Sequence, residues 1–167
     1  MSGDRIIPGR AVFLLARIAL GGVLVYAAYT KLVQPWQLFA MSIQAYQLLP
    51  EWGVTLLART LPGTELLLGV LLVIGWPMRI VATAASALLA GFFAIMLRSY
   101  LNGQAGIDCG CFGVGEALSA KTLLRDGALL GVSLGVTLAA FWQTRRTSEA
   151  VESVNAPTPG AAGEAAK

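Results

Sequence analysis

Apolar residues gather along this chain in four long blocks, which polar segments separate. A helix needs about 20 mostly apolar residues to cross the hydrocarbon core of a bilayer, and each block is long enough to do so. The pattern therefore predicts an all-α membrane protein with one domain, residues 1–142, built as a bundle of four transmembrane helices. The predicted spans are residues 11–29, 54–76, 80–101 and 121–142.

The segment 31–52, between the first two blocks, is too polar to cross a membrane. It nevertheless carries apolar residues on one side, and its Trp and Tyr residues favour the headgroup level of a bilayer. We expect an amphipathic helix that lies in the membrane interface and covers the loop that holds the cysteines. An ordinary amphipathic connector between two spans is the alternative.

Two further polar stretches complete the pattern. Residues 102–120 form the one long loop between spans and contain five glycines, so little regular structure is expected there. Residues 143–167 cannot bury enough apolar surface to fold, which predicts a disordered cytoplasmic tail. Rows of small residues in the third and fourth spans predict close packing of helices. These rows are Ala84, Ala87, Gly91 and Ala94, and Gly127, Gly131 and Gly135.

The composition agrees with a membrane protein and excludes several kinds of site. The chain of 167 residues is 56% hydrophobic and 13% charged, whereas soluble proteins carry about 25% charged residues. Its net charge of +3 comes from basic residues near the ends of the apolar blocks, which predicts a lipid bilayer and no nucleic acid as partner. The chain has no histidine, which excludes His-liganded haem, His-containing zinc or di-iron sites and Ser-His or Cys-His catalysis.

The distribution of arginine predicts the orientation of the protein. Four spans put both termini on one side of the membrane, and the positive-inside rule assigns that arginine-rich side to the cytoplasm. The loop with the cysteines then faces the periplasm of a bacterial inner membrane, where disulfides form and persist. The arginines in question are Arg5, Arg10, Arg79, Arg145 and Arg146.

The only two cysteines, Cys109 and Cys111, lie one residue apart in this loop. A disulfide needs its Cα atoms roughly 4.4–6.8 Å apart, which a bent tripeptide supplies, and Gly110 gives the backbone the freedom to bend. Such a small ring should be strained, and a strained, exposed disulfide is easily reduced. The two residues are therefore predicted to be a catalytic redox pair.

Two other roles stay open for the pair. A disulfide here would staple the loop, although closing so short a loop removes little chain entropy. Two thiolates would also capture a soft ion such as Cu(I), although they are too few for a closed zinc site. No resident metal is therefore predicted.

The charges near the pair bear on which sulfur reacts. Asp108 should raise the pKa of Cys109, which favours Cys111 as the attacking sulfur and Cys109 as the resolving one. A basic side chain folded over the loop would reverse this preference. The candidates for such a side chain are Arg98, Lys121 and Arg125.

Glu65 is the other candidate for a site residue, because a carboxylate inside a span is costly and is usually paired or functional. An ion pair with Arg98 or Lys31 is the structural interpretation. A proton acceptor for the thiol chemistry is the functional one.

Several landmarks together resemble the MauE family, the methylamine-utilisation proteins grouped with DoxX-like redox-associated membrane proteins. The most specific landmark is the run Asp108-Cys109-Gly110-Cys111-Phe112-Gly113, and the others match in order and spacing over residues 10–140. They are Lys31-Leu32 and Pro35, Tyr46 with Leu49-Pro50, and Leu61-Pro62 with Glu65 and Gly69.

The resemblance implies a four-helix membrane protein that works with a periplasmic thioredoxin-like partner. It also implies a role in maturing an exported, disulfide-rich client, as in maturation of the small subunit of methylamine dehydrogenase. Membrane enzymes that pass electrons from thiols to quinone generally use two cysteine pairs, whereas this chain has one. A thiol–disulfide oxidoreductase component of this kind needs a partner's second pair, or a direct acceptor such as a quinone cofactor.

Functions of other classes compete with thiol exchange. One is a non-catalytic membrane scaffold or transport component for a client subunit, and another is a soft-metal carrier. A pair that cycles with a partner indicates exchange, a permanently oxidised pair indicates a scaffold, and bound metal indicates a carrier.

Overall fold

The computed structural model describes residues 7–104, 106–112 and 115–155, and side chains between 11 and 142 of that part. Its elements are helices, and two short loop segments meet at one isolated antiparallel bridge. The helices are α1 (Ile7–Val33), α2 (Trp36–Ala45), α3 (Glu51–Ile74), α4 (Met78–Leu101) and α5 (Ala120–Asn155).

All of these helices except α2 are long and apolar enough to cross a membrane. The candidate spans within them confirm the predicted all-α fold class with four transmembrane helices. They are Ala11–Val33, Glu51–Ile74, Met78–Leu101 and Ala120–Trp142.

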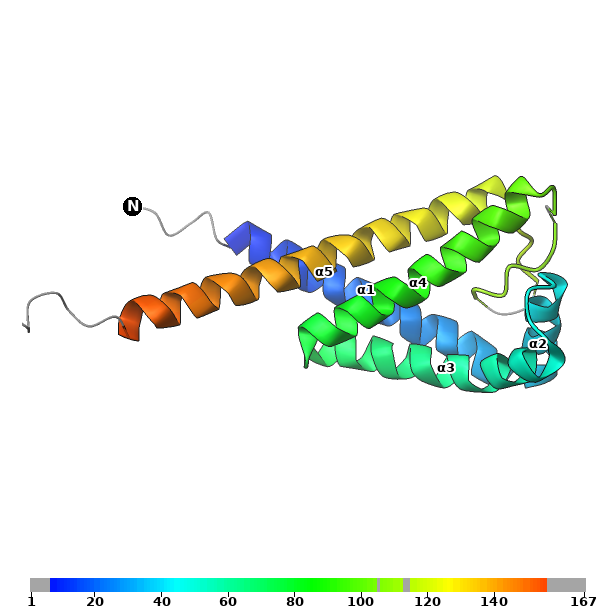
Figure 1. Cartoon of the computed structure of the whole chain (residues 1–167), viewed down its shortest axis with the longest axis horizontal. Coiled ribbons are helices and arrows are strands. Elements are labelled where there is room, and N and C mark those ends of the chain that lie inside the picture. Colours follow the sequence, from blue (N-terminus) through cyan, green and yellow to red (C-terminus); the bar gives the residue numbers. More distant parts are fainter. Residues whose placement is uncertain (1–6, 105, 113–114, 156–167) are drawn as a thin grey trace, which may run out of the picture.

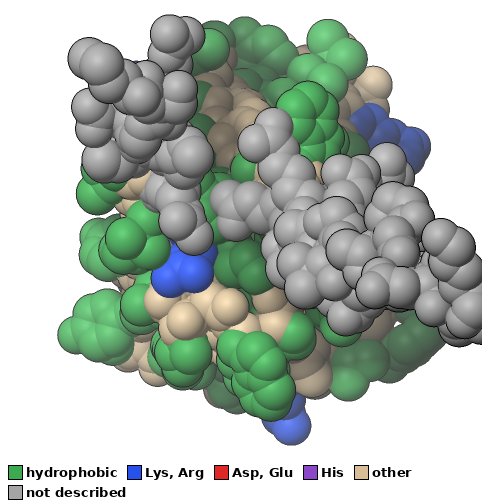
Figure 2. Space-filling model, turned by 90° about the vertical axis from the view of Figure 1, so that its left-hand side faces the viewer, with side chains coloured by type: hydrophobic (Ala, Val, Ile, Leu, Met, Phe, Trp, Pro, Cys, Tyr) green, Lys and Arg blue, Asp and Glu red, His purple; other side chains and the backbone are tan. Residues whose placement is uncertain are grey.

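The helices form an elongated bundle with two different ends (Figure 1). Helix α1 packs mainly along α3, and α4 packs mainly along α5. The short helix α2 and the loop between α4 and α5 lie together at one end, whereas the start of α1 and the end of α5 lie at the other. Figure 2 shows this second end, whose described surface is mainly apolar with Lys and Arg side chains among the apolar groups.

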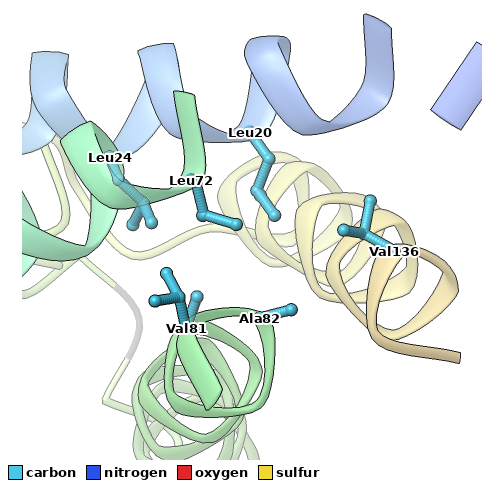
Figure 3. Packing of buried hydrophobic residues seen from close by; sticks show 7 residues of the cluster. Leu20, Leu24, Leu72, Val81, Ala82 and Val136 are labelled. Atoms are coloured by element: carbon cyan, nitrogen blue, oxygen red, sulfur yellow. The ribbon is translucent and has the colours of Figure 1, made fainter. Parts of the chain in front are cut away.

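The main core lies between α1, α3, α4 and α5, near the turn that joins α3 to α4. Its side chains point toward one another from all four helices (Figure 3). They are Leu20, Leu24, Leu72, Val81, Ala82, Ala85 and Val136. A second cluster at the loop end contains Cys109 with Met96, Leu118 and Leu123, and it anchors the cysteine loop to α4 and α5.

Helices α1 and α3 approach closely where Gly21 of α1 faces Gly69 of α3. A Cβ atom on Gly69 would lie 2.8 Å from the Gly21 carbonyl oxygen, and the reverse distance is also 2.8 Å. Of the glycines predicted to pack helices together, only Gly127 meets a neighbouring helix, where an added Cβ would lie 3.2 Å from the Phe93 ring. Gly91, Gly131 and Gly135 have open space where a Cβ would stand, because the helices turn these faces outward.

Several helix boundaries differ from the prediction. Helix α1 continues to Val33, beyond the expected end of the first span. Helix α5 continues to Asn155, so the tail expected to be disordered from residue 143 is helical over its first part, where Glu, Ala, Arg and Gln favour helix. Residues 156–167 lie outside the described part of the chain.

Arg17 of α1 reaches the end of α3. Its guanidinium donates a hydrogen bond to the carbonyl oxygen of Val73 at 3.3 Å. The last carbonyl groups of a helix lack partners within the helix and favour positive charge, so this contact stabilises the C-terminus of α3.

Candidate functional site in the cysteine loop

The loop between α4 and α5 is a small hairpin rather than irregular chain. Its two arms exchange backbone hydrogen bonds: Gly106 donates to Leu118 at 3.0 Å, Leu118 to Ile107 at 2.7 Å, and Cys109 to Glu116 at 2.8 Å. These bonds fix the position of Cys109 at the end of the first arm. Cys111 follows at the tip, and Gly113 of the same motif lies outside the described residues.

Asp108 and Gly110 shape the tip of the hairpin. The carboxylate of Asp108 accepts hydrogen bonds from the backbone N–H groups of Gly110 at 3.2 Å and Gly115 at 2.8 Å. Gly110 has a φ of 68°, which favours glycine, and a Cβ there would lie 3.3 Å from the Phe39 ring. The glycine between the cysteines is therefore required by both its backbone conformation and its contact with α2.

Helix α2 covers the loop, as expected from its apolar side. Tyr46 at its end donates a hydrogen bond from its hydroxyl to the carbonyl oxygen of Cys109 at 3.2 Å. Burial, together with the neighbouring Cys111, raises the pKa of Tyr46, so its hydroxyl stays protonated and keeps this bond. The predicted helix and its contact with the loop are confirmed, whereas its place in a membrane interface stays a prediction.

The two thiols differ in access and in acidity. Both are free; Cys109 is 3% exposed, whereas Cys111 is only half-buried. The thiol of Cys111 donates a hydrogen bond to Cys109, which lowers the pKa of Cys109 despite its burial. The same bond and burial raise the pKa of Cys111 well above its usual range. Cys109 is therefore the more acidic of the two thiols, and Cys111 is the more exposed one.

This acidity contradicts the expected effect of Asp108 on Cys109. The Asp108 carboxylate is turned into the tip, where it is held by two N–H groups. The carboxylate that faces Cys109 is Glu116, with 3.8 Å between the Cys109 Sγ and the Glu116 Oε2. Adjacency in the chain did not translate into proximity, because the turn points the Asp108 side chain away.

Arg125 of α5 is the basic side chain that folds over the loop. It binds both carboxylate oxygens of Glu116 at 2.8 and 2.9 Å, and one oxygen of Asp126 at 3.0 Å. Its guanidinium also stacks 4.3 Å from the centre of the Phe112 ring. The hydrogen bond from Arg125 lowers the pKa of Glu116, so this carboxylate stays ionised and ties the returning arm to α5.

Glu65 is paired with Lys31 beneath the loop. The Lys31 Nζ lies 2.7 and 2.8 Å from the two carboxylate oxygens of Glu65, and both residues are 3% exposed. Rings of Phe39 and Phe92 flank the ammonium group at 5.3 and 5.6 Å. Lys31 and Arg98 were the two partners predicted for Glu65. The structure pairs Glu65 with Lys31 and not with Arg98, and this ion pair joins α1 to α3.

A cavity of about 30 Å³ lies between this ion pair and the loop. Glu65, Cys111, Phe112 and Asp126 are among its lining residues. The Asp126 Oδ2 is buried and has no hydrogen-bond partner among the described residues. The cavity is large enough for one water molecule, and its few polar lining groups include Cys111 and Asp126.

Sequence reasoning missed two of the residues that the fold brings to the pair. Asp126 is a carboxylate inside a span, so the rule that singled out Glu65 also applies to it. Met96 places its Sδ 3.2 Å from the Cys111 Sγ, and nothing in the local pattern of α4 distinguishes it from a lipid-facing residue.

Comparison with known proteins gives a match over most of the chain. Residues 9–142 match the family described as methylamine utilisation protein MauE. The chain belongs to the MauE family. It is also 32% identical over 123 residues to the methylamine utilization protein MauE of Paracoccus denitrificans, covering 72% of this chain and 65% of that protein.

The MauE match includes all four candidate spans and the cysteine hairpin. The resemblance carried by the cysteine motif and the other landmarks is thereby confirmed. The aligned part spans less than two thirds of the Paracoccus protein. No solved structure matches the chain.

Proposed function

We propose that this member of the MauE family exchanges thiols and disulfides with an exported thioredoxin-like protein through Cys109 and Cys111. The observation that carries the proposal is the difference between the two thiols. One is half-buried and within reach of a partner, and the other is buried, with its pKa lowered by its neighbour. Exchange needs an accessible sulfur to be attacked and a good leaving sulfur beside it.

The exchange proceeds in two balanced steps. A thiolate of the reduced partner attacks the Cys111 sulfur of the oxidised pair, the bond between the two cysteines breaks, and its electron pair leaves on Cys109 as a thiolate. The partner's second thiolate then attacks its own sulfur in the mixed disulfide and releases Cys111. The partner becomes oxidised and the pair reduced by two electrons, and the reverse reaction uses the same intermediate.

Asp126 is the group best placed to take the proton when Cys111 must ionise. Asp126 lines the small cavity that Cys111 also lines, and its Oδ2 has no hydrogen-bond partner among the described residues. Glu65 lines this cavity too, but both of its oxygens are engaged by Lys31. The proton-acceptor role first considered for Glu65 therefore fits Asp126 better, with Glu65 as a structural ion pair.

The proposal also includes an orientation of the protein in the membrane and a cellular role. Arg17 and Arg79 lie at the end opposite the cysteine loop, which favours a cytoplasmic location for that end and a periplasmic one for the loop, in a bacterial inner membrane. Similarity to the Paracoccus protein favours a role in methylamine utilisation. The client would be a disulfide-rich exported subunit that the thioredoxin-like partner oxidises or isomerises.

Trapping the mixed disulfide tests the exchange. In Cys109→Ser the remaining Cys111 attacks a partner disulfide and nothing resolves the product, so a covalent complex should accumulate with a purified exported thioredoxin-fold protein. A non-reducing gel should show this complex, and reductant should remove it. Cys111→Ser should give almost none, because Cys109 is buried under α2.

The double variant, with both cysteines changed to serine, is the control for adducts at other sites. If neither single variant forms a complex, and both support client maturation as well as the parent does, the exchange proposal is wrong. The non-catalytic scaffold or transport function would then replace it.

A soft-metal carrier is the second candidate, and Met96 is the observation that favours it. Two thiolates alone make too few ligands, but the Met96 sulfur lies 3.2 Å from that of Cys111 and supplies a third soft donor. If the protein carries Cu(I), the reduced protein should bind one ion per chain, measured by metal analysis after anaerobic dialysis. Met96→Leu should weaken that binding, while Met78→Leu, on the same helix, should not. Binding that is absent, or that both variants retain equally, would exclude this site.

A further inference from the structure

The outward face of α3 carries a shallow groove over the first turns of the helix. Its volume of about 600 Å³ is within the range of roughly 300–1,000 Å³ that is typical of small-molecule sites. None of the residues that line it belongs to the cysteine loop, so the groove is separate from the site described above. The lining residues form two rows spaced four positions apart, Glu51, Thr55 and Arg59 in one and Trp52, Leu56 and Thr60 in the other.

Arg59 is an exposed cation inside a candidate membrane span. It lies eight positions after Glu51, where the span begins, which places it about 12 Å further along the helix axis. No carboxylate of the described residues forms an ion pair with it. A charge at such a depth is costly unless it is paired or reaches the headgroup level of the bilayer. Arg59 therefore needs an anion from outside the chain, and lipid phosphate is the anion that a bilayer supplies.

The start of α2 holds the Arg59 side chain in place for such a contact. The guanidinium carbon lies 4.5 Å from the centre of the ring of Trp36, the first residue of α2. Stacking on a ring leaves the N–H groups in the guanidinium plane free to bind two phosphate oxygens at once. Side chains of a helix lean toward its N-terminus, and the N-terminus of α3 lies at the loop end of the bundle (Figure 1). The guanidinium is therefore directed toward the headgroup level, which Trp36 also favours.

Glu51 distinguishes among the lipids that carry a phosphate. Its side chain is exposed in the first turn of α3, and no basic group of the described residues forms an ion pair with it. A carboxylate repels a headgroup of net negative charge, such as that of phosphatidylglycerol, and attracts one with an ammonium group beside its phosphate. The groove therefore presents one charge of each sign, which is complementary to a zwitterionic headgroup.

We propose that this groove binds the headgroup of phosphatidylethanolamine, with the phosphate on Arg59 and the ammonium group on Glu51. The phosphate oxygens accept hydrogen bonds from the guanidinium, and the ammonium group donates to the carboxylate. Arg59 leans toward Glu51, so one headgroup spans the distance between the two charges. Because Arg59 stacks on Trp36, the bound lipid also lies beside the start of α2, the helix that covers the cysteine loop.

Native mass spectrometry of the purified protein, titrated with phosphatidylethanolamine or with phosphatidylglycerol of the same acyl chains, tests the proposal. The parent should bind one phosphatidylethanolamine per chain, and more tightly than phosphatidylglycerol. Arg59→Gln should lower this affinity at least about tenfold, because it removes a bidentate, charge-assisted contact. The matched control is Arg98→Gln, which removes the same charge from an exposed position at the loop end of α4. It should bind phosphatidylethanolamine like the parent.

Two further variants separate the two contacts. Glu51→Gln should lower the affinity for phosphatidylethanolamine and raise that for phosphatidylglycerol, because it removes only the carboxylate. Arg59→Lys keeps the charge without the planar fork, so it should retain part of the affinity lost in Arg59→Gln. Circular dichroism should show the same helix content in all four variants, since the three side chains are exposed.

Three results would overturn the site. The first is an equal loss of affinity in Arg59→Gln and Arg98→Gln, which would mean that the lipid responds only to overall charge. The second is tighter binding of phosphatidylglycerol than of phosphatidylethanolamine by the parent. The third is a parent that binds neither lipid. None of them bears on the exchange function, because the groove contains neither cysteine.

Discussion

Replacing Glu65 with glutamine is expected to lower the free energy of unfolding by roughly 3–5 kcal/mol, because it leaves the buried Lys31 ammonium without its counter-charge. Glutamine keeps the shape of the side chain, so the loss reports the charge pair. The two side chains are 0% and 4% exposed, and the pair joins α1 to α3 directly under the cysteine hairpin. Protein yield and thermal unfolding in detergent should both fall.

Two further variants test whether the loss of stability comes from the buried ion pair. Glu51→Gln, on the same helix but exposed in its first turn, should cost less than about 1 kcal/mol through the helix dipole alone. Changing Lys31 to Met and Glu65 to Leu together should restore much of the stability, because an apolar pair of similar volume leaves no buried charge. A Glu65→Gln protein that accumulates normally but loses exchange activity would instead support the proton-acceptor role for Glu65.

Gly69→Val is expected to cost about 3 kcal/mol, because the new side chain meets backbone atoms rather than a flexible side chain. The Cβ alone would lie 2.8 Å from the Gly21 carbonyl oxygen and 2.9 Å from the Val25 nitrogen. Helices α1 and α3 would have to move apart, and the Lys31–Glu65 pair crosses the same interface. Thermal unfolding of the purified protein measures the loss.

The control for this prediction is Gly63→Val, the same substitution on the same helix. Gly63 is exposed and has no atom within 4 Å of the added Cβ, so the fold should tolerate it. Equal destabilisation of the two variants would show that valine disturbs α3 itself. The close crossing of α1 and α3 would then contribute little to stability.

The two cysteines lie in different surroundings. Cys111 and Asp126 line the same small cavity, and Cys111 is the more exposed of the two cysteines. Cys109 lines a larger, apolar cavity between α2, α3 and α4.

The fold class was readable from the sequence because a membrane span is a local property. Twenty or so consecutive apolar residues are sufficient to predict it, whatever the rest of the chain does. The helix over Trp36–Ala45 and its contact with the loop were also readable, because its apolar side needs a partner. The tail was predicted less well, since composition describes the lack of a core but not the helix propensity of residues up to Asn155.

Packing between helices could not be read in the same way. Small residues in register suggested contacts in α4 and α5, yet of the four glycines in these rows only Gly127 meets a neighbour, Phe93, and the close backbone contact is Gly21 on Gly69. A row of glycines permits close approach but does not say whether the row faces a neighbour or the outside. That depends on how each helix is rotated in the bundle, which all of its contacts decide together.

The sequence by itself therefore determined that the protein is a four-span membrane protein of the MauE type, with one cysteine pair in its long loop and a carboxylate in a span. The tertiary structure alone decided which charges meet: Lys31 with Glu65 across 34 positions, Arg125 with Glu116, and Asp126 facing Cys111. It also decided that Asp108, next to Cys109 in the chain, points away from it. Charge interactions weaken with distance and with solvent exposure, and only the folded chain determines both.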